Sequence, residues 1–240
     1  MIDWLKRAAF DPELDLNGET VPIVLRRHRT AKRLTLRLAP DGSEVRITLP
    51  RWAQAREAIA FAHARTGWLA AQHAKIPRRS SPGPGSEIFY RGNPLTVAWK
   101  EALPRRARLN GSTLAVGGAR SGIESRLKRW LESKALTLFE GDMADYAEAA
   151  KLAPVPLALS RAQKRWGSCS DQRRIRINWR LVQAPDFVRR SVIAHEVAHL
   201  VHFDHSPAFH ALLGEIYEDD ISQADRWLKE RGRTLYTSFG

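Results

Sequence analysis

The chain has 240 residues and a mass of 27.2 kDa, enough for one large domain or two small ones. Hydrophobic residues make up 43% and charged residues 27%, with eight Trp and eight Phe, which excludes a disordered chain. The single cysteine, Cys169, excludes an intramolecular disulfide and a four-cysteine zinc module, and it fits a reducing compartment. No apolar run approaches the roughly 18–20 residues that span a bilayer, and the N-terminus lacks the order of a secretory signal. We therefore expect a cytoplasmic protein with no membrane partner.

The formal net charge is +13, from 39 Lys and Arg against 26 Asp and Glu. Such a surface attracts polyanions, nucleic acid above all, through release of counterions. The alternative is that the charge serves only solubility, and we favour it because the clusters match no known nucleic-acid-binding motif. The basic clusters are Arg26, Arg27 and Arg29; Arg105, Arg106 and Arg108; Lys164 and Arg165; Arg173, Arg174 and Arg176; and Arg189 and Arg190.

The first part of the chain is predicted to be rich in β structure. Residues 1–18 are acidic and mixed in character, and we expect a loosely held tail. Alternating apolar residues then predict three strands, of which the last two form a hairpin around the turn at residues 40–43. Helical spacing follows, and a Pro- and Gly-rich linker at residues 77–85 ends it. The predicted strands span residues 21–25, 34–38 and 45–49, and the predicted helix spans residues 52–75.

The rest of the chain mixes short strands and helices without regular alternation, which indicates an α+β fold. Ser121 and Glu124 form a capping-box pattern before one long helix, and Pro185 suits the first turn of another. We detect no internal repeat. The predicted strands span residues 88–90, 95–99, 113–116, 157–160 and 175–178, and the helices span residues 121–150 and 186–203. We expect a tail (1–18), an N-terminal β-rich lobe (19–118) that carries no recognisable chemistry, and a C-terminal core (119–240).

Five of the eight histidines fall within residues 195–210. His195 and His199 are four apart on the predicted helix, so they project from one face with Cβ atoms about 5–6 Å apart. Both imidazoles can then reach a single metal ion at the zinc–nitrogen distance of about 2.0–2.1 Å. Glu196 follows the first histidine directly, so its carboxylate lies beside the metal, where it can deprotonate a metal-bound water.

The third ligand is predicted to be His205. In a continuous helix His205 would lie about 9 Å beyond His199 along the axis, so the helix must end near Phe203 and Asp204 for His205 to return. Ser206 and Pro207 suit the N-cap and first turn of a new helix. The rival is His202, which lies about one turn beyond His199 and is too far away to share the ion comfortably.

The five-residue pattern His-Glu-x-x-His also arises by chance in proteins without a metal site, and scattered histidines are usually surface or core residues. Here the pattern lies on a strongly apolar helix and a third histidine follows at chelating spacing, which favours a real site. Three neutral imidazoles with an open fourth position favour Zn²⁺ and a catalytic site over a structural one. We assign no role to the fifth histidine, His210.

These motifs resemble the YgjP-like zinc metallopeptidases, predicted metal-dependent hydrolases of the zincin class that are distantly similar to SprT-type proteases. The resemblance is strong over residues 161–210 and weak before them. It implies zinc ligands at His195, His199 and His205, a catalytic Glu196, and a zincin-like core in which the active-site helix packs on a small sheet. Asp204 stands where that family typically has Asn, a departure that leaves the ligand intact. The matching segments are Lys164–Ser170, Ile175–Leu181, His195–His199 and Asp204–Ser206.

Cys169 requires its own interpretation. An upstream cysteine is a metal ligand in peptide deformylase, but its context differs and His205 would then have no role. We expect the segment around Cys169 to be a tight turn that leads into a strand at residues 174–178. In zincins an edge strand near the metal helix pairs with extended substrate, so we assign that role to this strand.

The leading functional hypothesis is hydrolysis of peptide bonds in a protein or peptide substrate by zinc-activated water, with Glu196 as the base. Arg165, His202 and Tyr217 are candidates for stabilising the oxyanion, and the sequence does not choose among them. The spacing His-x3-His-x5-His also occurs in YbeY-type endoribonucleases, where Gly stands in the place of Glu196. A third hypothesis is a protease recruited to nucleic acid by its basic surface. The oligomeric state is left open.

Overall fold

The computed structural model describes residues 12–76, 81–153 and 155–239. The chain divides into two compact units, Met1–Arg78 and Arg79–Gly240. The boundary lies 40 residues before the one expected at residues 118 and 119, because the strands of residues 87–116 share a hydrophobic core with the long helix that follows them. The predicted linker at residues 77–85 spans the boundary, and its residues 77–80 lie outside the described residues.

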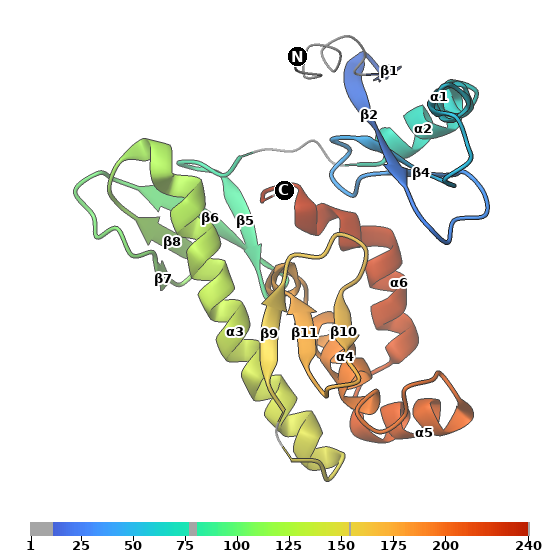
Figure 1. Ribbon diagram of the computed structural model, residues 1–240. Coiled ribbons are helices and arrows are strands. Elements are labelled where there is room, and N and C mark those ends of the chain that lie inside the picture. The colour runs from blue at the N-terminus through green and yellow to red at the C-terminus, as the bar shows by residue number, and fades with distance from the viewer. Residues whose placement is uncertain (1–11, 77–80, 154, 240) are drawn as a thin grey trace, which may run out of the picture. The chain divides into compact units, whose positions relative to one another are not determined.

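The first unit is a four-stranded sheet with two helices packed on it (Figure 1). The strand order is β1-β2-β4-β3, with β2 and β4 parallel and the outer pairs antiparallel. The predicted hairpin at residues 34–49 is confirmed, whereas residues 13–16 of the predicted tail form a strand, and the predicted helix is divided in two near Ala64 and Arg65. The elements are β1 (Glu13–Leu16), β2 (Glu19–Arg27), β3 (Thr35–Leu38), β4 (Val45–Leu49), α1 (Ala55–His63) and α2 (Thr66–His73).

The second unit begins with a four-stranded sheet of the same topology. Its order is β5-β6-β8-β7, again with a parallel central pair and antiparallel outer pairs. In both sheets the first hairpin turns on two residues with positive φ, Asn17 and Gly18 in one and Arg91 and Gly92 in the other. The backbone of a two-residue turn in which both residues have positive φ twists in the same sense as the paired strands that it joins. The strands are β5 (Glu87–Tyr90), β6 (Asn93–Trp99), β7 (Arg108–Asn110) and β8 (Thr113–Val116).

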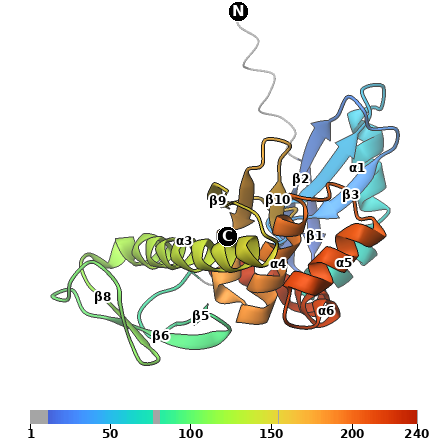
Figure 2. The same ribbon diagram turned by 90° about the horizontal axis from the view of Figure 1, so that it is seen from below.

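The long helix α3 (Ile123–Ala149) organises the second unit. Figures 1 and 2 show its N-terminal end against the β5–β8 sheet and its later turns beside a three-stranded sheet and α4. That sheet has the order β10-β11-β9, with β10 antiparallel and β9 parallel to β11. The remaining elements are a 3-10 turn before α3 (Arg120–Gly122), β9 (Leu157–Ser160), β10 (Gly167–Cys169), β11 (Ile175–Asn178), a 3-10 turn (Trp179–Gln183), α4 (Asp186–Ala198), α5 (Pro207–Ile216), α6 (Ile221–Arg231) and a 3-10 turn (Gly232–Tyr236).

One hydrophobic core joins these elements. Leu127, Leu131 and Phe139 of α3 are fully buried, and they belong to the same cluster as Ile177 of β11 and Ile193 of α4. The mixed helices and small sheets confirm the predicted α+β class. Among the described residues, no helix is both long enough and apolar enough to cross a membrane.

Candidate metal centre

The helix α4 carries the first two histidines of the predicted site, and two features anchor it. Its apolar side is buried, with Val188, Ile193 and Val197 fully inaccessible to solvent. Arg189 of the same helix donates through Nε to Asp142 Oδ2 of α3 at 2.6 Å, and both side chains are at least 94% buried. A buried ion pair with this geometry holds α4 against α3, because separating the partners would break charge-assisted hydrogen bonds in the interior.

The start of α4 is positioned by the β5–β6 turn. The amide of Gly92 donates to the carbonyl of Gln183 at 3.0 Å, two residues before the N-cap Pro185. A Cβ at Gly92 would lie 3.0 Å from Pro185, and the φ of +78° also favours glycine there. The second sheet therefore supports the metal helix directly.

The structure brings together the three histidines that the spacing singled out. The Nε2 atoms of His199 and His205 lie 3.1 and 3.3 Å from Nε2 of His195. The possible ligand atoms of all three lie within 4.8 Å of one another. Two nitrogens bound tetrahedrally to one zinc ion at about 2.05 Å are about 3.3 Å apart, so the imidazoles are spaced as a shared cation requires.

The chain reaches His205 because α4 ends earlier than expected. The helix stops at Ala198 rather than at residue 203, and the amides of Leu200 and Val201 donate to carbonyls three residues back in a tightened last turn. Ser206 then caps α5 by accepting from the Phe209 amide at 3.4 Å, as the sequence predicted. The last of these helical bonds is made by the amide of His202, so the chain leaves the helix after that residue and carries His205 back to the α4 histidines.

Phe209, which the sequence analysis did not identify, lies against the three imidazoles. It is fully buried, and its ring centroid lies 5.0, 4.6 and 4.9 Å from those of His195, His199 and His205. Its position three residues after the N-cap Ser206 places it on the inner side of the first turn of α5. The sequence predicted a new helix with Ser206 as its N-cap. An apolar residue three positions after that N-cap was therefore the sequence feature that could have identified Phe209 as a buried neighbour of the histidines.

The donor set suits a divalent cation. Nδ1 of His199 lies 3.0 Å from the carbonyl oxygen of His202, which can only accept, so Nδ1 carries the proton and Nε2 presents a lone pair. Burial, together with the neighbouring His199 and His205, lowers the pKa of His195 to about 4, so this imidazole is neutral at neutral pH. Neutral imidazole is the metal-binding form.

Glu196 is buried beside the histidines, with 6% of its surface exposed. Burial raises the pKa of its carboxyl to about 7, against the smaller opposing effects of the nearby Arg165 and of the Cys169 amide, which donates to it. Gly167 makes room for this carboxylate, because a Cβ there would overlap with Glu196 Oε1. A carboxylate with a pKa near neutrality can both accept and return a proton at neutral pH.

The strand beside Glu196 is not the one expected. The strand at residues 174–178 was predicted as the substrate-binding edge, but Ile175–Asn178 form the central strand β11 and are paired on both sides, so that assignment was wrong. The segment expected to be a tight turn is instead the edge strand β10. The amide of Asn178 donates to the carbonyl of Trp166, and the amide of Ser170 donates to the carbonyl of Arg174. Hydrogen-bonded and non-bonded residues alternate along an antiparallel strand, so Cys169, next to the bonded Ser170, directs its amide away from β11. That amide donates to Glu196 instead.

The other candidate residues have different surroundings. Arg165 is exposed and close enough to Glu196 to lower its pKa. His202 contacts His199 through its backbone carbonyl, whereas the buried hydroxyl of Tyr217 donates to the Phe187 carbonyl at 2.7 Å. Cys169 does not belong to the group of described residues that could together hold a metal ion.

Comparison with known proteins assigns the chain to a family. A structural comparison pairs the chain with the metallopeptidase zymogen of Pyrococcus abyssi abylysin at 16% identity and a TM-score of 0.36, covering 40% of this chain and 96% of that one, a likeness too weak to carry an argument. No curated protein sequence matches. The family model described as YgjP-like, metallopeptidase domain, matches residues 32–231. The chain therefore belongs to the YgjP-like family of metallopeptidase domains.

Proposed function

We propose that this protein is a zinc metallopeptidase that hydrolyses peptide bonds at the centre formed by His195, Glu196, His199 and His205. The observation that carries the proposal is the convergence of three imidazole Nε2 atoms, two of them 3.1 and 3.3 Å from the third, next to a buried carboxylate. Three nitrogen ligands leave a fourth tetrahedral position open, which is typical of catalytic rather than structural zinc sites.

The proposal assigns a distinct role to each side chain. The three imidazoles would hold the ion, which would supply Lewis acidity and lower the pKa of a water at the site. Glu196 would accept a proton from the attacking water and return it to the leaving amine, a role that suits a buried carboxylate whose pKa burial raises to about 7 in the metal-free chain. Arg165 is the best placed of the three oxyanion candidates, because Tyr217 donates its hydroxyl elsewhere and His202 contacts His199 through its backbone.

The edge strand β10 is the proposed binding site for the substrate backbone. It lies at the end of its sheet, and its Cys169 amide points towards the Glu196 carboxylate. An extended peptide that added to this edge would bring its backbone next to the proposed base. The zincin-like core would then comprise β9–β11, α4 and α5, all within the second unit.

The experiment that tests the proposal combines elemental analysis with digestion of a broad peptide library. We expect one zinc ion per chain and cleavage that is lost in Glu196→Gln while zinc is retained. Undiminished cleavage by that variant would refute the assignment of Glu196. An RNA substrate belongs in the same assay, because cleavage of RNA and not of peptides would favour the endoribonuclease hypothesis.

A further inference from the structure

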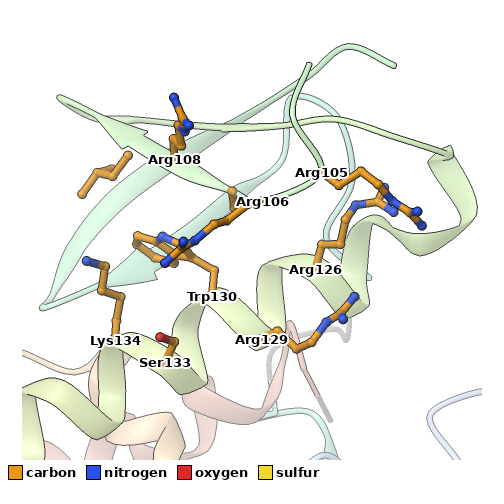
Figure 3. A pocket seen from close by; sticks show the side chains of 10 residues that line it. Arg105, Arg106, Arg108, Arg126, Arg129, Trp130, Ser133 and Lys134 are labelled. Atoms are coloured by element: carbon orange, nitrogen blue, oxygen red, sulfur yellow. The ribbon is translucent and has the colours of Figure 1, made fainter. Parts of the chain in front are cut away.

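A basic pocket of about 920 Å³ lies in the second unit, between the chain around β7 and the first half of α3. Figure 3 shows side chains from the two segments facing the same space. Six of the lining residues are cationic and none is acidic. The lining residues are Arg105, Arg106, Ala107, Arg108, Leu109, Arg126, Arg129, Trp130, Ser133 and Lys134.

Arg126 is the most informative of these residues, because it is buried without a full set of partners. It is 7% exposed, and Nη2 donates to the Ala119 carbonyl at 2.5 Å. Its Nε has no hydrogen-bond partner among the described residues. Its Nη1 packs closely against Gly122, where an added Cβ would lie only 2.6 Å from it. A buried guanidinium with an unused donor is costly unless an anion completes its contacts.

The charge of the basic pocket is not neutralised from within the described parts of the chain, where none of the six cations forms an ion pair. Glu132, an acid on the same stretch of α3, is paired with Arg161 at 2.9 Å. Further along the same helix, Asp142 accepts from Arg189 and Arg190. The excess of positive charge is therefore confined to the half of α3 that lines the pocket.

The pocket also offers an apolar surface. The Trp130 indole is half-buried and packs against Tyr90 with the ring centroids 5.1 Å apart, and Lys134 Nζ lies 6.0 Å from its centroid. Leu109 is 40% exposed. Cations that flank an aromatic ring are typical of sites where phosphates are paired with charge and a base stacks on the ring.

We infer that the basic pocket binds single-stranded nucleic acid, with phosphates contacting Arg106, Arg129 and Lys134 and one base against Trp130. A duplex keeps its bases stacked inside, so it would reach only the rim and leave the indole and the buried Arg126 without contacts. An acidic peptide would satisfy the charges but would not use the aromatic surface. None of the lining residues belongs to the proposed metal centre, so this inference is independent of the peptidase chemistry.

The test is fluorescence anisotropy of a labelled oligo-dT with the full chain over a range of salt concentrations. The salt dependence of log K has a slope of about −0.7 for each phosphate neutralised. The double variant Arg106→Ala/Arg129→Ala should therefore reduce the slope by about 1.4. The control is Arg26→Ala/Arg29→Ala, which removes the same charge from exposed positions in the first unit and should leave the slope near that of wild type. Equal effects of the two double variants would overturn the proposal.

A second arm tests the aromatic contact. Trp130→Leu should weaken oligo-dT binding about 5- to 150-fold, the range measured for loss of one base–aromatic stack. Trp130→Phe retains an aromatic face and should restore most of the affinity, which separates stacking from loss of packing against Tyr90. Equal affinity for duplex DNA, or competition by polyglutamate as strong as that by unlabelled oligo-dT, would also overturn the proposal.

Discussion

Replacing the Glu196 carboxylate with an amide is expected to stabilise the metal-free protein. Glu196 is 6% exposed, and burial raises its pKa from 4.5 to about 7. At 1.36 kcal/mol for each tenfold change in proton affinity, the charged form costs the folded state about 3 kcal/mol. The amide of a Glu196→Gln variant has no charge to desolvate, and its oxygen can still accept from the Cys169 amide.

The sign and the pH dependence of this effect follow from linkage. Below pH 4.5 Glu196 is protonated in both the folded and the unfolded chain, so it makes no difference to stability. Between pH 4.5 and about 7 the folded chain holds a proton that the unfolded chain has lost, so wild-type stability falls as the pH rises. The advantage of Glu196→Gln should therefore grow from about 1 kcal/mol at pH 5 to about 3 kcal/mol at pH 8. His195 titrates in both proteins and cancels in the difference.

The assay is thermal unfolding of chelator-treated wild type and Glu196→Gln at pH 5 and pH 8. At pH 8 the variant should melt about 6–12 °C higher, since 1 kcal/mol corresponds to about 2–4 °C in a chain of this size. The control Glu215→Gln makes the same change at an exposed position of α5 and should have little effect. Added zinc should reduce the advantage of Glu196→Gln, because a nearby cation favours the carboxylate. Equal melting temperatures at pH 8, or a difference that does not change with pH, would refute the reasoning.

Three further predictions concern the site and its support. His205→Ala should weaken zinc affinity by about 100-fold or more, which exceeds the usual effect of replacing a residue outside the ligand set. The control His210→Ala, at an exposed position, should leave zinc affinity unchanged. Equilibrium dialysis against a zinc chelator measures both affinities. Gly167→Ala should abolish peptide cleavage while zinc is retained, because its Cβ would displace the Glu196 carboxylate; wild-type turnover would show that this carboxylate position is not needed. Asp142→Asn should destabilise the fold by about 1.5–3 kcal/mol in urea unfolding, because it weakens charge-assisted hydrogen bonds from Arg189 and Arg190 while Asp186 still pairs with Arg189. A loss below about 0.5 kcal/mol would mean that Asp142 does not hold α4 against α3.

The arrangement of the three histidines was predictable because it depends on local geometry. All lie within eleven residues, so helical spacing and one chain reversal decide whether they can meet. The reversal itself was signalled by Ser206 and Pro207, although the helix ends five residues earlier than expected. Strand periodicity likewise predicted the hairpin at residues 34–49.

The parts that were missed depend on contacts between distant residues. Gly167 lies 29 positions before Glu196, and no local pattern shows that its missing Cβ makes room for that carboxylate. The choice of edge strand failed for the same reason, because pairing order in a sheet is a property of the tertiary fold. The shared topology of the two four-stranded sheets was also missed, because their sequences have little in common. The similarities are limited to short strands and to two-residue turns such as Asn17-Gly18 and Arg91-Gly92.

The basic clusters illustrate how charge in a sequence acquires meaning only from the fold. Arg189 and Arg190 form one of the clusters noted in the sequence, yet the fold neutralises them with Asp142 and other acids. The cluster at residues 105–108 is no denser, but the fold places it opposite the cations of α3, with no described acid paired to it. Repulsion within such a pocket disfavours the folded chain, so an anion that fills it should stabilise the protein as well as bind. A rise in melting temperature on adding oligo-dT, lost in Arg106→Ala/Arg129→Ala, is therefore expected from the same geometry.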